Sequence, residues 1–250
     1  MQRSIALVAL LALGIPPFAS PQPVTPPEEN ATPPVRTLAP EMRGDLAMAR
    51  QQYMAAIAAY REAPANSPEI WDKMGMAWHH LFAMDEARRD YQHALRLRPD
   101  YPEALNNLGA VYYARKDYRK AVKYYRKALR LKPGSAAALS NLGTAYFALG
   151  KPVLGLDAYR DAFALDPRVF DNGSALMVIE PLPPRDRAQQ DFCLAKIFAA
   201  SGKDTQAIDY LRRALNEGFA DRKQLLEDAT LATLRTTPAF SQLLVEQKLQ

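Results

Sequence analysis

The sequence predicts an all-α fold in which antiparallel helix pairs repeat along the chain and stack into an α-solenoid. The first observation is a fixed period, because Pro99, Pro133 and Pro167 follow one another at intervals of 34 residues. The second is that apolar residues recur three or four positions apart within each interval, which is the spacing of one helix face. The third is that a glycine lies at the same position ahead of each of these prolines; the three glycines are Gly75, Gly109 and Gly143. A single helix pair cannot bury its apolar face alone, so these blocks are expected to stack.

The first forty residues differ from the rest in composition. In residues 1–20, Arg3 precedes an uncharged apolar run that is too short to cross a bilayer as a helix and is typical of an export signal. The alternatives of cleavage near residue 20 and retention as an N-terminal membrane tether stay open. Residues 21–40 are rich in proline and polar residues, which predicts an extended linker.

The remaining composition is that of a globular protein. The chain has 250 residues, of which 48% are hydrophobic and 24% are charged, and its net charge is +5. This is enough apolar material for a sizeable core. Cys193 is the only cysteine, which excludes an intrachain disulfide.

The first complete block, 68–101, shows how each repeat is expected to fold. Trp71 and Trp78 supply bulk on its first helix, and Gly75 lies between them where a side chain would hold the second helix away. Pro99 ends the second helix. The blocks 102–135 and 136–169 predict the same pair of helices.

Two further segments carry weaker versions of this pattern. The stretch 41–67 predicts a partial helical repeat, in which one helical face carries Leu46, Ala49, Tyr53, Ala56, Tyr60 and Ala63. The stretch 188–221 predicts a degenerate fourth repeat, in which Ala195 replaces the glycine and no proline ends the second helix.

Residues 170–187 and 222–250 break the period. The first is expected to be an insertion loop without a helix, because it contains Pro181, Pro183 and Pro184. The second is expected to form a C-terminal cap of short helices, since terminal repeats present a polar outer face.

The repeated register resembles the tetratricopeptide repeat (TPR) family, whose pattern is W-x₂-L-G-x₂-Y…A-x₃-F…P. Eight positions match in each of 68–101, 102–135 and 136–169; in the first block they are Trp71, Met74, Gly75, Trp78, Ala87, Tyr91, Ala94 and Pro99. The resemblance implies a right-handed solenoid with a concave groove, which the first helix of each pair lines. It also implies a non-enzymatic scaffold or adaptor that binds a peptide or helix of a partner protein.

The groove positions give the candidate contact residues Asn106, Asn107, Tyr113, Asn141 and Phe147. Asn107 and Asn141 are equivalent, and a side-chain amide can donate to and accept from a peptide backbone at once. This is similar to the asparagine ladder of some peptide-binding members. The alternative, that Asn-Leu-Gly is simply common in the repeat, stays open.

Other groove positions limit the specificity. Asp72, His79 and Cys193 are also expected to face outward. Some members hold a C-terminal carboxylate with groove lysines, but Asp72 and Ala137 occupy those positions here. We therefore expect no carboxylate clamp.

The second block is strongly basic, and its charges are expected on the convex side. The candidate residues of this basic patch are Arg119, Lys120, Lys123, Arg126, Lys127 and Arg130. They favour an alternative function, electrostatic binding of an anionic polymer, an acidic protein or a membrane surface. A solvated helix face without a ligand is the other interpretation.

No catalytic or metal-binding motif is present. The chain lacks a Walker A loop, G-x-G-x-x-G, H-E-x-x-H and G-x-S-x-G. His79 and His80 are adjacent on a predicted helix, where side chains point about 100° apart. We expect no enzyme, no metal and no cofactor; an enzyme controlled by Cys193 or a groove carboxylate is the rival interpretation. The expected partners are proteins or peptides of the bacterial periplasm or cell envelope, and no nucleic acid.

Overall fold

The computed structural model describes residues 38–170 and 184–247. The export signal at 1–20, the linker up to residue 37 and residues 171–183 of the insertion lie outside the described residues. None of the described helices has the length and apolar content that a membrane span requires.

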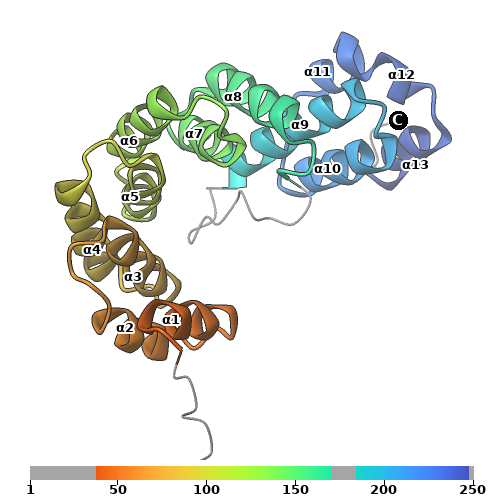
Figure 1. The fold of residues 1–250 in the computed structure, drawn as a ribbon. Helices are drawn as coiled ribbons and strands as arrows, with labels where there is room; N and C mark the ends of the chain where they lie inside the picture. Colours follow the sequence, from red (N-terminus) through yellow and green to blue (C-terminus); the bar gives the residue numbers. More distant parts are fainter. Residues whose placement is uncertain (1–37, 171–183, 248–250) are drawn as a thin grey trace, which may run out of the picture. The chain divides into compact units, whose positions relative to one another are not determined.

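The predicted all-α fold is confirmed, and the described ranges contain no β-strand. Consecutive helices pack as pairs from α1·α2 to α9·α10, and the first helices of neighbouring pairs contact each other, as in α3·α5 and α5·α7 (Figure 1). The helices of the five pairs are α1 (Pro40–Ala49), α2 (Tyr53–Arg61), α3 (Pro68–His80), α4 (Met84–Leu97), α5 (Pro102–Ala114), α6 (Tyr118–Leu131), α7 (Ala136–Ala148), α8 (Pro152–Leu165), α9 (Pro184–Ala200) and α10 (Asp204–Asn216).

The two helices of a pair approach each other at a glycine. A Cβ atom added to Gly75 would lie 2.6 Å from the ring of Tyr91, and one added to Gly109 would lie 2.7 Å from Tyr125. Each tyrosine is almost completely buried. Glycine is therefore needed at this position because the ring of the second helix occupies the space of its side chain.

The N-terminal unit differs from the expectation of a partial repeat with one continuous helical face. Residues 40–61 form a complete but short pair, because the chain turns between α1 and α2 at Gln51, where φ is 58°. Leu46 is consequently 41% exposed. Gly44 meets Tyr60 with the same sixteen-residue separation that joins glycine and tyrosine in the later pairs.

In the fifth pair, alanine and leucine occupy the positions that glycine and tyrosine occupy in the other pairs. Ala195 on α9 and Leu211 on α10 are both fully buried and have the same sixteen-residue separation. The extra methyl group on the first helix is accommodated because leucine is narrower than tyrosine.

The expectation that no helix forms within 170–187 is wrong at its end. Helix α9 begins at Pro184. A proline is tolerated in the first turn of a helix because its missing N–H would have no partner there. At the other end, Phe170 is buried and its ring lies 4.9 Å from that of Tyr159, measured between centroids.

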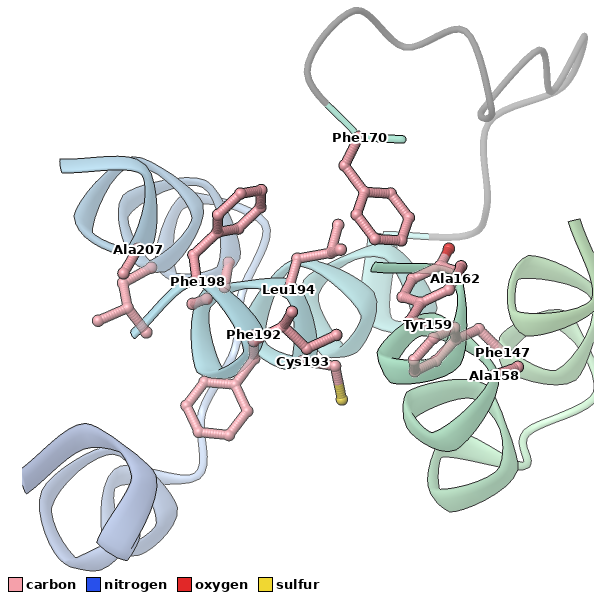
Figure 2. Close-up of a cluster of buried hydrophobic side chains, with 14 of the residues drawn as sticks. Phe147, Ala158, Tyr159, Ala162, Phe170, Phe192, Cys193, Leu194, Phe198 and Ala207 are labelled. Atoms are coloured by element: carbon pink, nitrogen blue, oxygen red, sulfur yellow. The ribbon is translucent and has the colours of Figure 1, made fainter. Parts of the chain in front are cut away.

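Residues 222–246 form short helical segments after the last pair. They are α11 (Arg222–Glu227), η1 (Ala229–Leu231), α12 (Ala232–Arg235) and α13 (Pro238–Glu246). Their buried side chains, which include Leu225, Leu234 and Phe240, join the same core cluster as α9 and α10. Figure 2 shows part of this cluster, in which Phe192, Leu194 and Phe198 project from one helix toward its neighbours.

Candidate functional site

A hollow of about 350 Å³ lies where α3, α5 and α7 come together. Its lining comes mainly from the first helices of three consecutive pairs, which is the surface where the sequence predicts a groove. The lining residues are Asp72, Met76, Pro102, Glu103, Asn106, Asn107, Ala128, Lys132, Ser135, Ala137 and Ala138.

A chain of hydrogen bonds crosses this surface from α3 to α7. The amide Nδ2 of Asn107 donates to Oδ1 of Asp72 at 3.1 Å, and Nδ2 of Asn141 donates to Oδ1 of Asn106 at 3.1 Å. A longer contact of 3.4 Å joins Nδ2 of Asn106 to Oδ1 of Asn107. The structure thus brings the three predicted asparagines together. Each amide uses one of its two N–H donors in this chain, so hydrogen-bonding capacity for a ligand remains.

Asp72 is the least expected member of this chain. The sequence places it at the groove surface, yet it is only 5% exposed, since α5 of the next pair packs against α3. Burial raises the pKa of its carboxyl to about 6, while the hydrogen bond from Asn107 acts in the opposite direction and the charge of Glu103 adds to the rise. At neutral pH the site therefore holds a desolvated carboxylate.

Asp72→Asn is expected to stabilise the fold at pH 7.5 by about 3 kcal/mol, because the pKa is raised from 3.8 to about 6 and one pKa unit corresponds to about 1.4 kcal/mol. The folded-state pKa is raised, so charging Asp72 opposes folding. This penalty is absent below pH 4, grows as pH rises toward 6 and is complete above it. Urea unfolding at pH 4 and 7.5 checks the prediction. An equal effect at both pH values would contradict it.

Ion pairs border the hollow. Nζ of Lys132 lies 2.8 Å from Oε1 of Glu103, and Arg98 lies 2.7 Å from Glu69. Burial is the largest single influence on Glu103 and acts to raise its pKa, but the hydrogen bond and charge of Lys132, a backbone hydrogen bond and the charge of Arg98 together outweigh it, so the pKa lies below its usual range. The cations nearest to Asp72 are therefore already engaged with other carboxylates.

Two of the predicted contact residues are not at the surface. Tyr113 is 5% exposed and Phe147 is 2% exposed, so both belong to the core and the prediction of ligand contact is wrong for them. The ring of Tyr113 packs on Tyr118 of the second helix. Phe147 fills the space that a side chain at Gly155 would need. Both aromatic residues lie near the C-terminal end of the first helix of a pair, and the sequence pattern did not predict that their side chains are buried there.

His79 and Cys193 are also buried, contrary to the expected outward orientation. Burial lowers the pKa of His79 to about 4 and raises the pKa of the Cys193 thiol to about 11. Both are consequently uncharged at neutral pH, and Cys193 lacks the thiolate that a nucleophile needs. Within 38–170 and 184–247, no three histidine, cysteine, aspartate or glutamate side chains cluster as metal ligands would.

The predicted basic patch lies on α6, and all of its members except Lys120 line a shallow hollow of about 470 Å³. Lys120 pairs with Asp117 at 2.7 Å. Across the described residues, no acidic side chain lies within ion-pairing distance of the other five members, Arg119, Lys123, Arg126, Lys127 and Arg130. Val122 also lines this hollow.

Comparison with known families agrees with the repeat architecture. A family model described as tetratricopeptide repeat matches residues 102–135, and a second model described as TPR repeat matches residues 83–116. The chain therefore contains tetratricopeptide repeats. The matched residues include α5, with Asn106 and Asn107 of the TPR groove, and α6, with the basic patch.

One solved TPR structure shares the fold at low sequence identity. A thermophilic TPR protein from Thermus thermophilus has a TM-score of 0.51 and 18% identity, with 82% of this chain and 97% of that chain covered. MamA has a TM-score of 0.49 and 20% identity, with coverage of 70% and 93%. The first TPR of Spaghetti (RPAP3), bound to an HSP90 peptide, has a TM-score of 0.43 and 24% identity, with coverage of 44% and 90%. No curated protein matches the TPR chain in sequence.

Proposed function

We propose that this TPR protein is a non-enzymatic scaffold that binds an extended peptide of a partner protein in the hollow formed by α3, α5 and α7. The observation that carries the proposal is the hydrogen-bonded chain of Asp72, Asn107, Asn106 and Asn141, whose first three members line the hollow. These side chains hold one another in place before a ligand arrives, which reduces the entropy lost on binding.

The chemistry of these groups suits a peptide backbone. An extended peptide presents an N–H and a C=O group at every residue, and each amide of the chain retains one donor and acceptor capacity on its oxygen. The apolar lining from Met76, Pro102 and Ala137 can cover ligand side chains between these polar contacts. Main-chain contacts would give affinity and the lining would give specificity.

We propose further that the partner belongs to the bacterial cell envelope or periplasm. The support is the apolar run at 5–15 behind Arg3, which has the composition of an export signal. Retention of this segment would tether the TPR unit to a membrane.

A second candidate function is electrostatic binding of an anionic ligand on α6. Its support is that five cations surround one hollow without acidic partners in the described residues. This interaction would weaken steeply with salt, because exposed charges are screened over about 8 Å at physiological ionic strength. Groove binding would depend less on salt.

The test is a capture experiment from an extract of cell envelopes with the full-length chain as bait. We expect Asn107→Ala/Asn141→Ala to lose the partner and the matched surface variant Lys123→Gln/Lys127→Gln to retain it. Loss only with the lysine variant would contradict the groove and favour the basic patch. Circular dichroism of each variant verifies that the helices are intact.

A further inference from the structure

We propose that the hollow formed by α3, α5 and α7 receives a lysine side chain of the bound peptide, with its ammonium group at Asp72. This inference rests on the proposed peptide-binding function and adds the chemical class of the ligand. In this site a carboxylate of the protein would bind a cation of the ligand, whereas a carboxylate clamp uses cations of the protein to bind a carboxylate of the ligand.

The first argument is that no cation pairs directly with Asp72 among the described residues, although the charge of Arg98 acts on it from a longer distance. Its Oδ1 atom accepts from the neutral amide of Asn107, and no cation of the described residues lies within 4 Å of its carboxylate. Arg98 is paired with Glu69 and Lys132 is paired with Glu103. A buried carboxylate is normally paired with a cation, so this carboxylate is arranged to accept one from outside.

The second argument is the shape and lining of the hollow. Met76, which is 38% exposed, lines it together with Pro102 and Ala137, and these apolar groups suit the methylene stem of a long side chain. Asp72 lies among the same lining residues, beside the side-chain amide of Asn107. A lysine can thus bury its stem and bring its charged end to the carboxylate.

The third argument distinguishes lysine from arginine. Arginine binds carboxylates best through two parallel hydrogen bonds to both oxygens. At Asp72 one oxygen is already bonded to Asn107, which leaves one oxygen for a ligand. A compact ammonium group with three donors fits a single oxygen, and a neighbouring amide oxygen can accept a second bond.

The electrostatic environment supports the same ligand. The pKa of Asp72 is raised to about 6 because the carboxylate is desolvated, and an incoming cation would relieve this cost. The charged groups around it are Glu69 on α3, Arg98 after α4, Glu103 on α5 and Lys132 after α6, and all four are paired. Protonation of Asp72 below pH 6 is therefore expected to weaken the binding of a cation.

The test uses three pentapeptides of the form acetyl-Ala-Ala-X-Ala-Ala-amide, in which X is lysine, its neutral counterpart norleucine, or glutamate. Each is titrated into the full-length chain while the NMR signals of the Asn106 and Asn107 side-chain amides are followed. At pH 7.5 we expect lysine to bind about tenfold more tightly than norleucine, which is the effect of one charged hydrogen bond. Glutamate is expected to bind most weakly.

Two variants assign the preference to Asp72. Asp72→Asn keeps an oxygen that accepts from Asn107, so folding is expected to persist, and the lysine preference should fall below about twofold. The matched variant Asp100→Asn removes one negative charge from an exposed position and should leave the preference unchanged. Lowering the pH to 4.5 in the unmodified chain should reproduce the Asp72→Asn result without any substitution.

The outcomes separate the two proposals. Equal binding of lysine and norleucine, or a preference that persists in Asp72→Asn, would overturn the lysine site while leaving peptide binding in the groove intact. Tighter binding of glutamate would overturn the lysine site as well. If none of the three peptides shifts the Asn106 and Asn107 signals, both the lysine site and the proposed function fail.

Discussion

Gly143→Ala is expected to lower the free energy of unfolding by about 3 kcal/mol, at the upper end of the cost of overfilling a core. The added Cβ atom would clash with the ring of Tyr159 and would lie 3.0 Å from the backbone oxygen of Gly155. The ring has no room to move, because Tyr159 is fully buried and its hydroxyl is hydrogen-bonded to Thr144 and Gln190. Alanine favours a helix over glycine by about 1 kcal/mol, which offsets only part of this cost.

Urea unfolding followed by circular dichroism measures this change. Gly134→Ala is the matched control, since no atom lies within 4 Å of a Cβ atom at Gly134. The cause can be isolated with Gly143→Ala/Tyr159→Leu, which copies the natural pairing of alanine and leucine at the fifth pair. We expect the double variant to lose clearly less than the sum of its single variants. Additive losses would show that the ring is not what excludes the methyl group.

Phe198→Ala is expected to cost about 4 kcal/mol, in the range for truncation of a buried phenylalanine. Phe198 is fully buried on α9 and contacts both α8 and α10. Its ring meets that of Phe163 on α8 edge-on at 5.4 Å and stacks on Tyr210 of α10 at 5.2 Å. The substitution removes contacts both within the fifth pair and between the fourth and fifth pairs.

Because stacked repeats contact only their neighbours, the loss should be local as well as large. We expect α9 to α13 to unfold at lower urea concentration than α3 to α8, and hydrogen exchange to show this order. Phe82→Ala is the control, because Phe82 is 67% exposed and should change stability by less than about 0.5 kcal/mol. A single transition with little loss of stability would contradict this account of the core.

The features that the sequence determined are local and repeated. The 34-residue interval, the prolines and the glycines predicted the pairs from α3 to α8, because each of these signals acts within one or two helices. The first pair was less clear because it lies 31 residues ahead of the second, measured from Gly44 to Gly75. Its glycine and tyrosine nevertheless keep the separation of the other pairs, so this signal could have identified a complete pair.

The candidate site was predictable only in part. Asn106, Asn107 and Asn141 could be placed on one surface because equivalent positions of a repeat face the same way. Their hydrogen bonds to one another depend on the distance between neighbouring pairs. That distance is set by how the side chains of two neighbouring pairs pack together. The 34-residue period of the sequence does not predict this packing.

The tertiary structure decided which of the groove positions are buried. Three residues share a helical face with exposed residues and are nevertheless buried. Asp72 is covered by α5, Tyr113 by the ring of Tyr118 on α6, and Phe147 by α8. Conversely, the small side chain of Ala137 leaves the hollow beside Asp72 open. The sequence by itself therefore determined the helices from α3 to α8 and their pairing. The desolvated carboxylate was decided by tertiary structure, because burial depends on the size of the side chains that the next pair brings against it.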